Sequence, residues 1–251
     1  TGGEPLLYRE LPDLIKTVSP EDTYISVNSN GTLFTDSIAQ ELSSAGVDAM
    51  LFSIDTADAR AHDAFRGQDQ AFRRTLEALD IARRHKMKVC VVCTLSHASI
   101  RDSGVAKLID LTRQKRVMLI LSRAALAGNW CGEWDMLLDE EDQRLMYDLV
   151  RRHPHVRTDF ETNILKSGCG AGTEKIYVTP YGDVLPCPFL HISFGNIFTT
   201  PIEKIRQRII ARLGFYAQKC YAAENREFIQ RYLSKTFDHK SLITEEECFG
   251  D

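Results

Sequence analysis

The first part of the chain, up to about residue 122, alternates short apolar runs with longer amphipathic stretches. This alternation restricts the fold more than any other feature, because it predicts an α/β fold with a parallel sheet and right-handed crossovers. Gly46 follows the helix-like stretch 36–45 and has the place of a C-cap glycine. The strand-like runs are TYISVNSN (23–30), VDAMLFSID (47–55), MKVCVVCTLS (87–96) and RVMLILS (116–122).

Three further stretches have helical periodicity, at 71–86, 103–115 and 139–153. The last of them opens with acidic side chains, which suit a helix N-terminus. For the stretch 71–86 we expect one apolar face to point inward. That face consists of Phe72, Leu76, Leu79 and Ile81.

The character of the sequence changes after about residue 165. A cysteine-bearing hairpin pattern is followed by two more helix-like stretches, at 200–213 and 224–235. We therefore predict two parts, 1–162 and 163–251, with the smaller one of mixed α+β type.

Charge and hydropathy exclude several kinds of partner. The net charge is −4, and both signs are mixed along the chain, so there is no basic stripe of the kind that binds nucleic acid. No apolar run reaches the about 20 residues that span a bilayer. The opening residues TGGEPLLYRE lack the pattern of a signal peptide. The sequence predicts a cytoplasmic protein that binds neither nucleic acid nor membrane.

Polar residues follow several of the predicted strands, where functional groups gather at the carboxyl edge of a parallel sheet. Ser53 and Asp55 end one strand, and their oxygens could bind ribose or the polar groups of an amino acid. Arg66, in HDAFRG, could hold a carboxylate. The alternative is a capped helix entry with solvated charges.

The opening motif TGGEP is expected to join the end of a strand to a helix. Gly2 and Gly3 would let the backbone approach a ligand closely, and Glu4 would accept hydrogen bonds from a cationic group. The alternative is a tight loop without a ligand.

The chain has seven cysteines, an odd number, and in a reducing compartment clustered cysteines more often bind metal than form disulfides. Cys169 and Cys187 stand on either side of the predicted hairpin turn at Tyr181–Gly182. A hairpin could bring both sulfurs to one centre, either an iron–sulfur cluster or zinc. Cys220 and Cys248 are candidates to complete the ligand set. The alternative is a pair of small buried hydrophobic residues.

A second cysteine pair, Cys90 and Cys93, lies within a predicted strand. Residues three apart in a strand point to opposite faces, so these two cannot chelate one ion. We expect them to be core residues.

Five motifs in order give the chain a specific resemblance: TGGEPLL, NSNGTLFT, AGVDAMLFSID, HDAFRG and YVTPYGDVLPCPF followed by FGNI. Together they resemble the radical SAM superfamily, in particular its members with a C-terminal SPASM or twitch domain. The spacing of Cys169, Gly182 and Cys187 is similar to the opening of the SPASM pattern. The resemblance implies a partial (β/α)6 TIM-like barrel without its first strand and cluster loop, followed by a small α+β domain.

The resemblance also implies roles for individual residues. Gly2, Gly3 and Glu4 match the GGE motif that contacts the amino group of S-adenosylmethionine. Ser29 and Ser53 match strand-end hydroxyls near that cofactor, and Arg66 resembles a carboxylate-binding arginine.

For the metal site, the resemblance implies that Cys169, Cys187 and Cys220 are ligands of an auxiliary 4Fe–4S cluster. Its fourth iron is then either open to substrate or bound by Cys248 or by a residue that is not cysteine. A single auxiliary cluster is expected, since nothing matches the cysteine-dense middle of a full SPASM domain.

The CxxxCxxC motif that binds the catalytic cluster in this family is absent from the 251 residues. We expect it upstream of TGGEP in a longer protein, and we expect the present chain alone to be inactive. The resemblance then implies an enzyme that generates a 5′-deoxyadenosyl radical and abstracts hydrogen from a peptide or small metabolite, with flavodoxin or ferredoxin as electron donor. The alternative is a non-catalytic iron–sulfur or zinc protein whose partial barrel binds a peptide or protein partner.

Overall fold

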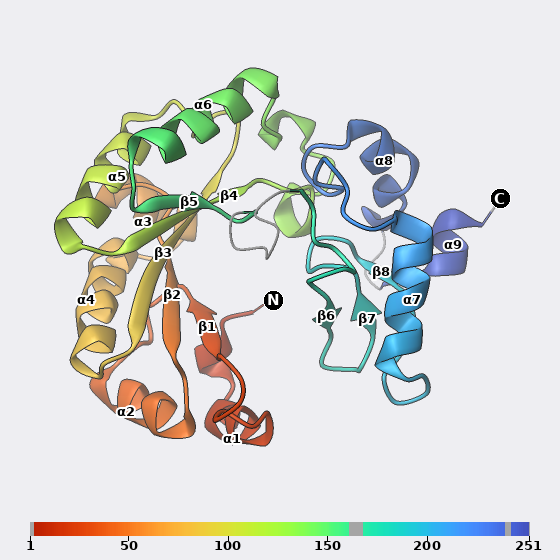
Figure 1. The fold of residues 1–251 in the computed structure, drawn as a ribbon. Helices are drawn as coiled ribbons and strands as arrows, with labels where there is room; N and C mark the ends of the chain where they lie inside the picture. The colour runs from red at the N-terminus through yellow and green to blue at the C-terminus, as the bar shows by residue number, and fades with distance from the viewer. Residues whose placement is uncertain (1–2, 161–167, 239–241, 251) are drawn as a thin grey trace. The chain divides into compact units, whose positions relative to one another are not determined.

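The computed structural model describes residues 3–160, 168–238 and 242–250 (Figure 1). The chain divides into two compact units. The first unit comprises 1–122 and 145–157, and the second comprises 123–144 and 158–251. The predicted boundary at residue 162 stays a prediction.

A five-stranded sheet with the order β1-β2-β3-β4-β5 organises the first unit. β1 pairs with β2 and β2 with β3 in parallel, as the alternating pattern predicted. The first three strands fall within their predicted runs, β4 overlaps the fourth run and ends one residue beyond it, and β5 was not predicted. The strands are β1 (Ser26–Ser29), β2 (Ala49–Ser53), β3 (Lys88–Leu95), β4 (Met118–Arg123) and β5 (Val156–Thr158).

Helices connect these strands, and α4 packs against both β2 and β3 (Figure 1). The α/β class with a partial barrel is thus confirmed. Among the described residues, no helix is both long and apolar enough to cross a membrane. The helices up to β5 are η1 (Pro5–Leu7), α1 (Leu11–Thr17), α2 (Asp36–Ala45), α3 (Ala59–Arg66), α4 (Ala71–Arg84), α5 (Ser103–Lys115), η2 (Gly128–Trp130), η3 (Trp134–Met136) and α6 (Glu140–Arg152).

The inward face of α4 differs from the predicted one. Leu79 is buried as expected, but the other three predicted residues are only partly buried. Small side chains take their place and allow the helix to lie close to the sheet. The Thr75 hydroxyl donates a hydrogen bond to the carbonyl oxygen of Asn30 at 2.7 Å, and this bond allows the hydroxyl to be buried. The buried residues of α4 are Ala71, Thr75, Ala78, Leu79 and Ala82.

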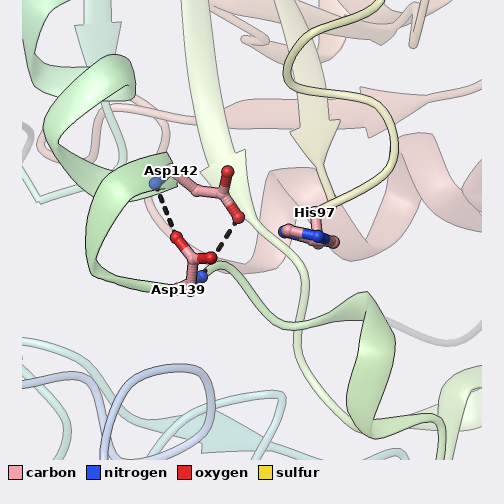
Figure 2. A group of neighbouring side chains, drawn as sticks. All are labelled: His97, Asp139 and Asp142. Carbon is pink, nitrogen blue, oxygen red and sulfur yellow. Dashed lines mark hydrogen bonds between the residues drawn. The ribbon is translucent and has the colours of Figure 1, made fainter.

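Two carboxylates start α6 by capping each other (Figure 2). The Asp142 backbone N–H donates to Asp139 Oδ1 at 2.8 Å, and the Asp139 N–H donates to Asp142 Oδ2 at 3.1 Å. This reciprocal arrangement satisfies two donors that a helix start would otherwise leave unpaired. It explains why the acidic sequence marks the beginning of this helix.

The second unit contains the predicted hairpin, with β6 antiparallel to β7, and a parallel pair of β8 with β9. The predicted helix 200–213 is present as α7, whereas the stretch 224–235 is interrupted at Tyr232, between α8 and η4. Its elements are β6 (Tyr177–Val178), β7 (Val184–Leu185), β8 (Ile192–Ser193), α7 (Ile202–Leu213), α8 (Arg226–Arg231), η4 (Leu233–Thr236), β9 (Ile243–Thr244) and α9 (Glu245–Phe249).

Gly46 ends α2 as predicted, in a left-handed conformation with φ of +104°. A Cβ added there would lie 2.4 Å from Pro20 Cβ. We expect Gly46→Ala to lower the free energy of unfolding by about 1–3 kcal/mol, since it adds a clash to backbone strain. Denaturant titration followed by circular dichroism measures this loss.

Gly67 provides the matched control, because it ends α3 at φ of +62° with no atom within 4 Å of an added Cβ. Gly67→Ala should therefore cost less than Gly46→Ala. Equal losses for the two variants would contradict the importance of the Pro20 contact.

Candidate cofactor edge and metal centre

Hydrogen bonds of the Glu4 carboxylate connect the opening segment to the carboxyl end of β1. Its Oε1 accepts a hydrogen bond from the Ser29 hydroxyl at 2.6 Å, and its Oε2 accepts one from the Asn30 N–H at 2.8 Å. The Ser29 Oγ in turn accepts from the Gly31 N–H at 3.0 Å. The structure thus brings Glu4 and Ser29, two of the predicted cofactor residues, into direct contact. Gly3 is exposed, and Gly2 lies outside the described residues.

The neighbouring strand end carries Ser53 and an ion pair. Ser53 is the last residue of β2 and is half-buried. Two residues further, Asp55 Oδ2 lies 2.7 Å from Arg66 Nη2, which reaches back from the end of α3. Arg66, expected to hold a ligand carboxylate, therefore pairs with a carboxylate of the chain itself. Its contact with a ligand stays a prediction.

His62 lies next to this ion pair, with its Nδ1 3.7 Å from Asp55 Oδ2, and is only 1% exposed. Its Nδ1 accepts a hydrogen bond from the Asp55 N–H at 3.4 Å, and its ring meets that of Phe72 edge to face. Burial lowers the pKa of His62, although the Asp55 carboxylate opposes that shift. The imidazole is therefore held neutral in the folded chain.

The cysteines of the second unit are placed differently from the hairpin prediction. Cys187 follows β7, but Cys169 precedes the hairpin and pairs with Ala217 in an antiparallel bridge. The Cys169 N–H donates to the Ala217 carbonyl oxygen at 2.7 Å. Cys169 is therefore brought toward Cys220 by this bridge, and a hairpin shoulder is not its position.

A tight turn after Cys169 connects it to the segment of Cys187. Three backbone N–H groups, of Thr173, Glu174 and Lys175, donate to the Gly170 carbonyl oxygen. The Gly172 N–H donates to the Pro186 carbonyl oxygen at 3.1 Å. The turn thereby lies against the residue just before Cys187.

Cys169, Cys187 and Cys220 interact with one another in the folded chain. A hydrogen bond from the Cys220 thiol lowers the pKa of Cys169 to about 6, against the opposing effect of burial. The same hydrogen bond, together with burial, raises the pKa of Cys220. Burial, with a smaller contribution from Cys169, raises the pKa of Cys187 to about 12. The three thiols are thus close enough to one another to interact through a hydrogen bond and through charge.

Backbone donors surround these sulfurs. The N–H groups of Ala171 and Tyr221 hydrogen bond to the Cys169 sulfur, and those of Phe189 and Leu190 to the Cys187 sulfur. The Lys175 cation favours the thiolate form of both cysteines. Converging thiolates with N–H donors are the ligand environment of iron–sulfur clusters, so these residues fit such a group.

Cys248 has different interaction partners from these three cysteines. It is fully buried on α9, and its Sγ lies 3.8 Å from the Tyr232 carbonyl oxygen. Burial raises the pKa of Cys248 to about 11, while Lys235 and Arg212 act against that shift. Its predicted role as a ligand stays a prediction.

Cys90 and Cys93 both lie in β3, where Cys93 is fully buried and its Sγ is 3.3 Å from the Asp55 carbonyl oxygen. Burial raises the pKa of both thiols.

Sequence reasoning missed two charged residues near the metal site, Lys175 and the buried Arg123. Arg123 ends an apolar strand whose burial alternates, and only its place in register with the buried Leu119 and Leu121 could have signalled its burial.

Family comparisons match both parts of the chain. Residues 1–111 match the model of the radical SAM superfamily, and residues 169–222 match the model of SPASM, an iron–sulfur cluster-binding domain. The chain belongs to the radical SAM superfamily. The SPASM match begins at Cys169 and includes Cys187 and Cys220, whereas Cys248 lies beyond it.

Individual relatives agree with this membership. An AdoMet-dependent heme synthase of Methanosarcina barkeri is 24% identical over 82% of this chain and 66% of that protein. The mycofactocin maturase MftC of Mycolicibacterium smegmatis is 30% identical over 79% of this chain and 54% of that protein. The chain thus spans between half and two thirds of the length of these two relatives.

Among solved structures, Streptococcus suis SuiB bound to S-adenosylmethionine is similar with a TM-score of 0.64 and 14% identity. The likeness covers 99% of this chain and 65% of SuiB, and it shows a shared fold.

The burial of His62 in this radical SAM chain predicts an acid-dependent stability. Because the pKa of His62 is lowered on folding, the unfolded chain binds more protons once the pH falls below about 6.5. The contribution of neutral His62 to stability should therefore be present above that pH and be lost as the pH falls. Denaturant midpoints at pH 7.5 and pH 5.5 would measure the loss, and His62→Gln should reduce the difference between them.

The metal centre predicts unequal effects for its cysteines. After anaerobic reconstitution, Cys187→Ala should lose most of the bound iron, because one of three converging thiolates is removed. Cys248→Ala serves as the control, since Cys248 is a buried cysteine of the same unit with different interaction partners, and it should keep its iron. Iron analysis and visible absorption measure both, and equal loss in the two variants would make Cys248 a ligand.

Proposed function

We propose that this chain is part of a radical SAM enzyme that abstracts hydrogen from a peptide or small-metabolite substrate and carries one auxiliary 4Fe–4S cluster. The observation that carries the proposal is that Cys169, Cys187 and Cys220 interact with one another within the segment that matches SPASM. The match of residues 1–111 to the superfamily supports the radical chemistry.

The residues of the first unit would bind and orient the cofactor. S-adenosylmethionine, together with a reduced 4Fe–4S cluster, supplies the 5′-deoxyadenosyl radical in this family. Glu4, held by Ser29 and Asn30, would present a fixed carboxylate to the cofactor amino group. Ser53, at the adjacent strand end, would offer a hydroxyl on the same edge of the sheet.

Glu4 also fixes the geometry of this edge before any cofactor binds. Its part-buried, charge-assisted hydrogen bonds restrict both partners, and such preorganisation lowers the cost of binding. The Asp55–Arg66 pair would fix the neighbouring loop in the same way.

In the second unit, the three cysteines would hold the auxiliary cluster, and the N–H donors around them would stabilise the thiolates. The fourth iron would be left for substrate or for another ligand. A cluster placed in this way would either anchor substrate or relay electrons.

The relatives support a peptide as the first substrate class to test. SuiB has also been crystallised with its precursor peptide SuiA, and MftC is named a maturase. A heme synthase among the relatives keeps a small metabolite as the second class. We place the protein in the cytoplasm, with flavodoxin or ferredoxin as electron donor, in line with its seven free cysteines.

The proposal predicts that the complete gene product, anaerobically reconstituted and reduced, converts S-adenosylmethionine to 5′-deoxyadenosine. Chromatography of the quenched reaction measures the product. Absence of product with reductant present and all clusters loaded would contradict the enzyme and favour a non-catalytic iron–sulfur protein. Zinc in place of iron would contradict the cluster itself.

Glu4→Ala tests the cofactor edge in the same preparation. Loss of hydrogen bonds to a charged group should weaken S-adenosylmethionine binding by about 10-fold to 100-fold. Glu10→Ala is the matched control, since Glu10 is an exposed carboxylate bonded to the exposed Tyr8 hydroxyl. Titration calorimetry measures the affinities, and equal affinities for the two variants would remove Glu4 from the site.

A further inference from the structure

A buried arginine lies close to the metal centre of the second unit. Arg123 is 3% exposed, and its guanidinium lies over the Phe160 ring, 4.2 Å from the ring centre. Its Nη1 lies 2.6 Å from Asp159 Oδ1, and its Nε lies 3.3 Å from Glu224 Oε1. One cation thus joins two carboxylates from segments that are far apart in the sequence.

Glu224 connects this ion pair to a cysteine. Its side chain is 7% exposed, and its Oε2 accepts a hydrogen bond from the Cys220 backbone N–H at 2.6 Å. The Glu224 and Asn225 N–H groups both donate to the Cys220 carbonyl oxygen at 2.9 Å. The peptide groups on both sides of Cys220 are therefore fixed by the segment that contains Glu224.

A purely structural ion pair would explain this arrangement less well. Buried ion pairs are weak contributors to stability, because desolvation offsets their attraction, and apolar residues often replace them without loss. What apolar residues could not supply here is an acceptor for the Cys220 N–H. They also could not supply charge close to the thiols, where Asp159 acts on Cys220.

We propose that Glu224 is a positioning residue of the auxiliary cluster, locked by Arg123, which orients Cys220 as a ligand and sets the charge around it. The proposal rests on the proposed function, since it takes Cys220 to be a ligand. The Glu224 carboxylate favours the oxidised, less negative cluster, and the Arg123 cation favours the reduced one. Their balance then contributes to the reduction potential of the centre.

Two substitutions separate positioning from charge. Glu224→Gln keeps an oxygen acceptor for the Cys220 N–H but removes one negative charge, so iron should be retained and the midpoint potential should shift upward. Glu224→Ala removes the acceptor as well, and iron retention against a chelator should weaken by about 10-fold to 100-fold. Glu227→Gln is the matched control, an exposed carboxylate in the first turn of α8, and should change neither quantity.

The measurements are iron content after chelator challenge and a redox titration followed by electron paramagnetic resonance. Circular dichroism reports whether each variant folds, and the Glu224→Gln potential decides the case if Glu224→Ala does not fold. Unchanged potential in Glu224→Gln would overturn the proposal, as would unchanged iron retention in a folded Glu224→Ala. A parent chain that binds no iron–sulfur cluster would overturn the proposed function instead, before any variant is compared.

Discussion

The hydrogen bond from the Cys169 N–H to the Ala217 carbonyl oxygen closes the second unit around its cysteines. Without this bridge, Cys169 would be an ordinary loop residue, because no strand of its own holds it. The turn after Cys169 then rests on the segment before Cys187 through the Gly172 N–H. A few backbone hydrogen bonds therefore hold this region in place of long strands. One of them fixes Cys169 itself, and the other fixes the residue before Cys187.

The edge of the first unit is built by a different physical means. There, side-chain oxygens provide the connections. The Glu4 carboxylate accepts hydrogen bonds from the Ser29 hydroxyl and the Asn30 N–H, and the Thr75 hydroxyl on α4 donates to the Asn30 carbonyl oxygen. Gly31 completes this turn at φ of +78°, where an added Cβ would lie 3.0 Å from Thr75 Cγ2. The turn is thus held on both sides by polar groups that a search for apolar periodicity passes over.

The sequence predicted the elements whose signal is local. Four strands and the main helices follow from apolar runs and periodicity, and Gly46 marked a helix end correctly. β5 has three residues and β8 has two, too few for a period to be visible. The inward face of α4 was predicted from large apolar residues, whereas close packing on the sheet required Ala78 and Thr75.

The residues of the candidate site could be predicted only where they belong to a sequence motif. The resemblance selected Cys169, Cys187 and Cys220 together, but the bridge to Ala217 is a contact between distant segments and has no local pattern. The burial of Arg123 depends in the same way on Asp159 and Glu224, which come later in the chain. Pairings of this kind become visible only once the chain is folded.

The small inward face of α4 has a consequence for altering this protein by directed evolution. Libraries that enlarge Ala78 or Thr75 would push the helix outward and carry the Asn30 turn with it, so most members would lose the cofactor edge as a whole. The partly buried Leu76 and Ile81 can vary in size at lower cost, whereas Phe72 packs against the buried ring of His62. The safer route to a changed substrate range therefore leaves the underside of the helix untouched and diversifies its flanks.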